Sequence, residues 1–199
     1  MMTDPSLDRE VPGRTDLSIS MEKANLYSLV FALPLAALLV ALYVLRWEVG
    51  GAISGFNSLF GAFLTFLIVF FAGIVLHELI HGLTWMLFGR KPLRAIRFGF
   101  QLKTLTPYAH CTEPMGVNAY RIGTVMPGIL LGLFPTLLGI MNGNGWLLAF
   151  GALFTMAAGG DFLILWLLKD VDRRKLVEDH PTRAGCYILD PPPPTLESK

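Results

Sequence analysis

The chain has 199 residues, of which 53% are hydrophobic and only 16% are charged, and its mean hydropathy is +0.55. A soluble domain usually carries about 25% charged residues, so this composition indicates an integral membrane protein. The net charge is +1, and no basic run stands apart from the expected membrane boundaries, so nothing indicates nucleic-acid binding.

The first half of the chain contains a polar start and two apolar spans. Residues 1–24 are polar and mixed in charge, and we expect them to form a flexible cytoplasmic tail. The first span, at about 25–45, is long enough to cross a hydrocarbon core of about 30 Å. A glycine-rich link (46–58) leads to the second span, at about 59–88, which is longer than one crossing requires.

The second half contains a hairpin pattern and two more spans. From Ile96 to Lys103, apolar residues alternate with polar or small ones, and this period of two is typical of a strand. With a second strand ending at Cys111, the pattern predicts a β-hairpin over about 93–111. Two further spans follow at about 122–141 and 146–168. The remaining residues, 169–199, read as a second cytoplasmic tail with a proline-rich end.

The predicted fold is therefore an all-α integral membrane protein with four transmembrane helices in one domain (25–168) and a short cytoplasmic β-hairpin between the second and third. Lys and Arg gather in the N-terminal tail, the segment after the second span and the C-terminal tail, which four crossings place on one side. Because cytoplasmic loops carry the excess of these residues, both termini are expected in the cytoplasm. Cys111 and Cys186 then face a reducing compartment, which argues against a disulfide.

The chemistry of the chain centres on His77-Glu78-Leu79-Ile80-His81, an H-E-x-x-H motif inside the second span. On a helix, His77 and His81 lie one turn apart on the same face, so both imidazoles can reach one metal ion. Glu78 is then placed to act as general base toward a metal-bound water. Ionisable side chains are costly in an apolar helix unless something pairs with them, so the setting strengthens the prediction of a metal site.

A third ligand is needed, because a catalytic zinc usually has three protein ligands and one water. Asp161 is the only acid inside the fourth span. At a rise of about 1.5 Å per residue, His77 lies roughly 16 Å and Asp161 roughly 10 Å from the cytoplasmic ends of their helices, which run in the same direction. The two depths agree within the uncertainty of the helix ends, so we expect Asp161 to complete the site. A hydrogen bond between helices is the alternative role for this carboxylate.

Two further residues are candidates for the same site. His110 is a rival third ligand or a substrate contact, and a solvated histidine is the alternative. Glu113 is a candidate partner of a ligand histidine, although a surface charge explains it as simply. His180 precedes Pro181, which restricts it to extended conformations, and this favours a structural role.

With these residues in view, the sequence resembles known families. The motif His77 to Gly82 in a membrane helix, with an aspartate in a later one, is similar to the site-2 protease class of intramembrane metalloproteases. From His77 to about Leu189, the chain more closely resembles a bacterial family of uncharacterised zincin membrane peptidases. The matching features are the His-Glu-Leu-Ile-His-Gly helix, Tyr108-Ala109-His110-Cys111-x-Glu113-Pro114, Gly160-Asp161, and Asp179-His180-Pro181 followed by Gly185.

The resemblance implies that His77, His81 and Asp161 bind zinc and that Glu78 is the catalytic acid and base. It also implies a location in the bacterial inner membrane. One feature departs from the pattern, because Asp161 lies in Gly-Gly-Asp-Phe, whereas site-2 proteases typically carry Leu-Asp-Gly or Asn-Pro-Asp-Gly.

The function predicted from the sequence is a membrane-embedded peptidase with one Zn²⁺ per chain, acting in the lipid bilayer on membrane-anchored proteins or peptides. Two alternatives stay open. One is a non-catalytic scaffold or regulator with a structural metal site. The other is a metal transporter, although the chain lacks the internal repeat that many transporters show. The sequence names neither the substrate nor the oligomeric state.

Overall fold

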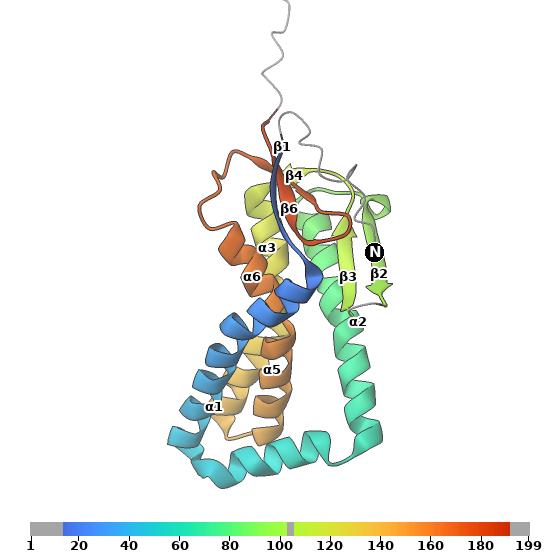
Figure 1. Cartoon of the computed structure of the whole chain (residues 1–199). Helices are drawn as coiled ribbons and strands as arrows, with labels where there is room; N and C mark the ends of the chain where they lie inside the picture. Colours follow the sequence, from blue (N-terminus) through green and yellow to red (C-terminus); the bar gives the residue numbers. More distant parts are fainter. Residues whose placement is uncertain (1–13, 103–105, 192–199) are drawn as a thin grey trace, which may run out of the picture.

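The computed structural model describes residues 14–102 and 106–191, which form a mostly helical protein with small antiparallel sheets at one end (Figure 1). The helical elements are α1 (Met21–Phe60), α2 (Phe63–Phe88), the 3-10 turn η1 (Leu93–Ala95), α3 (Val117–Pro127), the π-helical turn η2 (Gly128–Leu133), α4 (Phe134–Asn142), α5 (Gly145–Ala157) and α6 (Gly159–Leu167). The strands are β1 (Arg14–Ile19), β2 (Ile96–Gln101), β3 (Thr106–Cys111), β4 (Met115–Gly116), β5 (Leu176–Asp179) and β6 (Ala184–Leu189).

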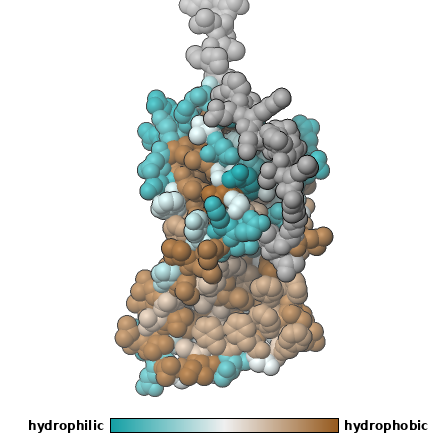
Figure 2. Space-filling model, viewed as in Figure 1, coloured by the Kyte–Doolittle hydropathy of each residue, from teal (hydrophilic) through white to brown (hydrophobic). Residues whose placement is uncertain are grey.

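Three helical stretches in the described chain are long and apolar enough to cross a membrane: α1, α2, and the continuous run of α3, η2 and α4. The pair α5 and α6 is a fourth candidate, bent by 45°. Each of the four spans expected from the sequence corresponds to one of these stretches. Figure 2 shows hydrophobic residues over the helical part farthest from the sheets and hydrophilic residues gathered around the sheets. The chain is therefore built like a multi-pass membrane protein with a polar cap.

Helix α1 extends beyond the expected first span and includes most of the glycine-rich link. Its backbone leaves helical geometry at Glu48 (φ 70°, ψ 164°), and the remainder runs across the base of the bundle to α2 (Figure 1). Glycine permits close packing here, because a Cβ on Gly55 would lie 2.0 Å from the backbone of Gly145. The Tyr43 hydroxyl donates to the carbonyl of Gly143 at 2.8 Å. The link is helical rather than a loop because its glycines pack against the turn before α5.

The β-hairpin expected over 93–111 is present as β2 and β3. The two strands pair antiparallel, from Ile96 opposite Cys111 to Gln101 opposite Thr106. The hairpin packs on α2 at Gly82, where a Cβ would lie 2.7 Å from the Phe98 ring. It therefore lies alongside the half of α2 that carries the H-E-x-x-H motif.

A four-stranded sheet in the order β1-β6-β5-β4 differs from what the sequence led us to expect. Strand β1 falls within the segment expected as an N-terminal tail, and β5 and β6 fall within the expected C-terminal tail. The pairing is long-range, with Thr15 opposite Ile188. The sheet contributes Met115, Val177, Cys186 and Ile188 to a buried core that also contains Trp85 and Tyr120 from the helices. These short strands are ordered by burial against α2 and α3, a contact that local composition does not reveal. The outer parts of both expected tails, including Pro192 to Pro194, lie outside the described residues.

Candidate metal centre

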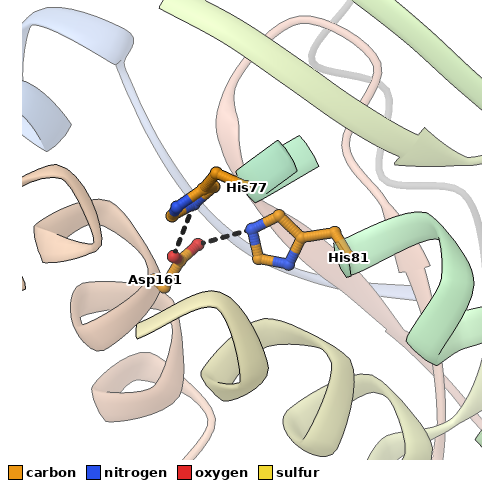
Figure 3. Close-up of side chains that lie close together, drawn as sticks. All are labelled: His77, His81 and Asp161. Atoms are coloured by element: carbon orange, nitrogen blue, oxygen red, sulfur yellow. Dashed lines mark ion pairs between the residues drawn. The ribbon is translucent and has the colours of Figure 1, made fainter. Parts of the chain in front are cut away.

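His77, His81 and Asp161 form one buried cluster between α2 and α6 (Figure 3). The His77 Nε2 atom lies 3.1 Å from Asp161 Oδ2, and the His81 Nε2 atom lies 3.2 Å from Asp161 Oδ1. One donor atom from each residue lies within 4.8 Å of the others. The structure thus brings together the three residues that the motif and the depth argument selected.

Helix α2 positions the two histidines through their spacing of one turn. Both imidazoles are buried, with 7% of His77 and 6% of His81 exposed. The His81 Nδ1 atom lies 2.9 Å from the carbonyl oxygen of Gly123 on α3. A carbonyl can only accept, so this contact places the hydrogen on Nδ1 and leaves the Nε2 lone pair facing Asp161. A ligand histidine is usually oriented by such a bond from its other nitrogen.

A stack of aromatic rings supports the His81 imidazole. The Trp85 ring lies parallel to it with centroids 5.4 Å apart, and Tyr120 stacks on the other side of Trp85 at 5.5 Å. Gly123 makes room for Trp85, since a Cβ there would lie 2.2 Å from the indole ring. The orientation of His81 is therefore fixed by packing as well as by its hydrogen bond.

Asp161 reaches the histidines because α5 and α6 meet at a bend. Ala158 joins the two helices, and Asp161 lies in the first turn of α6. Gly159 lets the bend approach α1, because a Cβ at that position would lie 2.8 Å from the carbonyl oxygen of Ser28. The start of α6 is thereby held between α1 and α2, with its carboxylate directed at His77 and His81.

The donor set fits a divalent metal ion such as zinc. Two imidazole nitrogens and a carboxylate oxygen are its common ligands, and around a tetrahedral ion with bonds of about 2.0–2.1 Å such atoms lie about 3.3 Å apart. The two nitrogen–oxygen distances of 3.1 and 3.2 Å are close to that separation. Asp161 Oδ2 is also buried without a hydrogen bond. The lone pairs of His81 Nε2 and the carboxylate face each other, and a cation between them removes their repulsion.

Glu78 follows His77 on α2 and lines the same cavity, which has a volume of about 620 Å³. The cavity walls come from the start of α1, the metal cluster on α2 and α6, strand β3, and the loop between β5 and β6. The Glu78 carboxylate accepts a hydrogen bond from the backbone N–H of Ala109 on β3. The acid is therefore held beside the cluster, where a water or substrate in the cavity can reach it.

The other two candidates from the sequence lie in different surroundings. His110 lines the cavity, and its Nδ1 atom lies 3.6 Å from Asp179 Oδ2. Glu113 is not among the lining residues, and its half-exposed carboxylate pairs with Lys91 at 3.5 Å. The structure therefore gives Glu113 an ion pair with Lys91 and no contact with a ligand histidine. His180 accepts hydrogen bonds from the backbone of the turn that follows it, consistent with a structural role.

Asp179 is a buried residue of the cavity wall that the sequence analysis assigned no role. Its Oδ2 atom accepts a hydrogen bond from the Cys111 N–H at 2.7 Å, and its Oδ1 atom accepts one from the Tyr120 hydroxyl at 2.5 Å. Burial raises the pKa of this carboxyl group, and the two hydrogen bonds oppose that rise. The Asp179-His180-Pro181 segment was noticed in the sequence, but the sheet that carries Asp179 to the cavity was not expected.

Comparison with known proteins places this geometry in a family. A family model described as "Putative zincin peptidase" matches residues 70–175, which include the H-E-x-x-H motif and Asp161. No curated protein and no solved structure matches the chain. Since the match covers just over half of the residues, the chain belongs to this putative zincin peptidase family, for which zinc is the implied metal.

Proposed function

We propose that the protein is a zinc-dependent, membrane-embedded peptidase that hydrolyses peptide bonds of membrane-anchored substrates. The observation that carries the proposal is the convergence of His77, His81 and Asp161 on one buried point, with Glu78 beside it in an open cavity. A purely structural zinc site is normally closed by four protein ligands, and this cluster has three. Membership of a zincin peptidase family agrees with this assignment.

In this mechanism His77, His81 and Asp161 hold the zinc ion. Zinc bound there would supply a Lewis acid for the peptide carbonyl and would lower the pKa of a bound water toward 7. Glu78 takes a proton from the attacking water as its oxygen bonds to the carbonyl carbon. When the carbon–nitrogen bond breaks, Glu78 returns that proton to the leaving amine. The hydrogen bond from Ala109 fixes the carboxylate for both transfers.

Strand β3 supports the binding of an extended peptide. The backbone N–H groups of Ala109 and Cys111 point away from β2, since they contact Glu78 and Asp179. Successive N–H and C=O pairs of a strand alternate in direction, so the Ala109 carbonyl also faces the cavity side. A helical substrate hides its amides, and pairing with this edge would keep a segment extended for cleavage.

The pairing of β1 with β6 supports the expected topology. Residues 14–19 and 184–189 are neighbours in one sheet, so both ends of the described chain lie on the same side of the helices. That requires an even number of crossings, which is met when α5 and α6 together form the fourth span. The excess of Lys and Arg at this side places it in the cytoplasm of a bacterial inner membrane. Leu76, Leu79 and Leu83 of α2 are exposed, and we assign them to contact with lipid or substrate.

The experiment compares wild type with Glu78→Gln in vesicles of phosphatidylethanolamine and phosphatidylglycerol. The probes are labelled casein and model proteins with one transmembrane helix. Glu22→Gln is the matched control, because Glu22 is an exposed acid in the first turn of α1. We expect about one zinc per chain in all three proteins, cleavage by wild type and by the control, and loss of cleavage in Glu78→Gln. Undiminished cleavage by Glu78→Gln would refute the mechanism. Cleavage of casein but of no membrane-anchored probe would refute the substrate class.

A further inference from the structure

The inference concerns His110, the cavity residue that the proposed mechanism does not use, and it rests on the proposed peptidase function. His110 is on β3, and its side chain is 23% exposed. Its neighbour Ala109 donates to the Glu78 carboxylate, so His110 follows directly after the residue that touches the proposed base. The imidazole therefore belongs to the same reaction space as the metal cluster.

Asp179 fixes the direction of the imidazole. The His110 Nδ1 atom lies 3.6 Å from Asp179 Oδ2, so Nε2 is on the opposite edge of the ring. Asp179 itself is immobilised by the Tyr120 hydroxyl and the Cys111 N–H, and its side chain is only 10% exposed. A carboxylate held by two other elements is a fixed reference for the ring beside it.

The fold does not need His110 in order to satisfy Asp179. Both carboxylate oxygens already accept a hydrogen bond, one each from Tyr120 and Cys111. The 3.6 Å separation from His110 is longer than a hydrogen bond, so this contact contributes little to stability. A partly exposed imidazole that is structurally dispensable and directed by a buried acid is better explained by a ligand in the cavity.

We propose that His110 is a second catalytic residue, whose Nε2–H donates to the oxygen of the scissile carbonyl, and that Asp179 positions it. As the water oxygen bonds to the carbonyl carbon, the carbonyl π electrons move onto that oxygen, and the hydrogen bond to Nε2–H strengthens without transferring a proton. The pair needs a hydrogen on Nε2. A charged ring beside a carboxylate and a neutral ring beside a carboxyl group both provide it. The substrate group recognised is the oxyanion of the tetrahedral intermediate.

The test uses the zinc-loaded full chain with labelled casein as substrate and a phosphonamidate dipeptide as a mimic of the tetrahedral oxyanion. The variants are His110→Phe, His110→Gln and Asp179→Asn. Arg97→Gln is the matched control, because Arg97 is exposed and lies opposite His110 on β2. For His110→Phe we expect kcat to fall about 10²- to 10³-fold, with little change in KM. Phosphonamidate affinity should fall by a similar factor.

The further readouts separate a catalytic role from a structural one. Zinc content and thermal midpoint should match wild type in His110→Phe, and the amide donor of His110→Gln should recover about tenfold of the lost rate. Because Asp179 acts through His110, adding Asp179→Asn to His110→Phe should lower kcat no further.

Each contrary result has a distinct meaning. Unchanged kcat and phosphonamidate affinity in His110→Phe would overturn the inference while leaving the peptidase intact, and loss of zinc in that variant would show that His110 is a ligand instead. A wild-type protein that cleaves none of the probes would overturn the proposed function and this inference with it.

Discussion

Replacing Gly123 with alanine should weaken zinc binding although Gly123 is not a ligand. Its carbonyl orients His81, and its missing side chain leaves space for the Trp85 ring that stacks on His81. An added Cβ would lie 2.2 Å from that ring, whereas ordinary contact begins near 3.4 Å. The indole must therefore move by about 1 Å, a displacement large enough to misalign a catalytic group. Trp85 is 4% exposed, so the movement is transmitted to the rings on either side.

Two opposing effects set the size of the change. Alanine is favoured over glycine in a helix by about 0.8–1 kcal/mol. Overpacking a buried site costs about 1–3 kcal/mol, so the free energy of unfolding should fall by at most about 2 kcal/mol. Zinc affinity should fall by more, about 10- to 100-fold, as is typical when the group that orients a ligand histidine is disturbed.

The assay is a zinc titration of the apo protein against a chromophoric chelator. Gly50→Ala is the matched control, because Gly50 also lies in a helix and a Cβ there meets nothing within 4 Å. The control should bind zinc like wild type. If Gly123→Ala also binds zinc with wild-type affinity, the packing of Trp85 does not position His81 and the reasoning fails.

Two further predictions concern the cytoplasmic side of the structure. Burial raises the pKa of the Cys186 thiol to about 12, so the folded state favours the neutral thiol. The stability from this group is complete below about pH 9 and is lost as the pH rises toward 12. Maleimide should therefore label Cys186 at pH 8 only after denaturation, and rapid labelling of the folded protein would contradict its burial. Arg121 donates to the carbonyls of Leu168 and Val171 at the end of α6, so Arg121→Met should lower stability by about 1.5–3 kcal/mol. An unchanged thermal midpoint would show that these contacts do not hold α6.

The metal cluster was accessible from the sequence because its geometry follows from helical regularity. The spacing of His77 and His81 places both on one face, and the constant rise of a helix made the depth of Asp161 comparable with theirs. The π-helical turn η2 and the bend between α5 and α6 were not predictable, because hydropathy reports length and not curvature. The depth estimate still selected the right acid because the bend lies before Asp161.

The polar cap was not accessible from the sequence. Strands β1, β5 and β6 are short, and their pairing joins segments more than 160 residues apart. What orders them is the burial of Val177, Cys186 and Ile188 against Trp85 and Tyr120, which no local pattern encodes. Since Asp179 enters the cavity on β5, the environment of His110 was out of reach for the same reason.

Zinc-edge X-ray absorption of the purified wild-type protein tests the central claim most directly. The account predicts about one zinc per chain, with only nitrogen and oxygen ligands at about 2.0–2.2 Å and imidazole scattering from His77 and His81. A protein that binds no zinc, or a spectrum with sulfur near 2.3 Å from Cys111 or Cys186, would contradict a site formed by His77, His81 and Asp161.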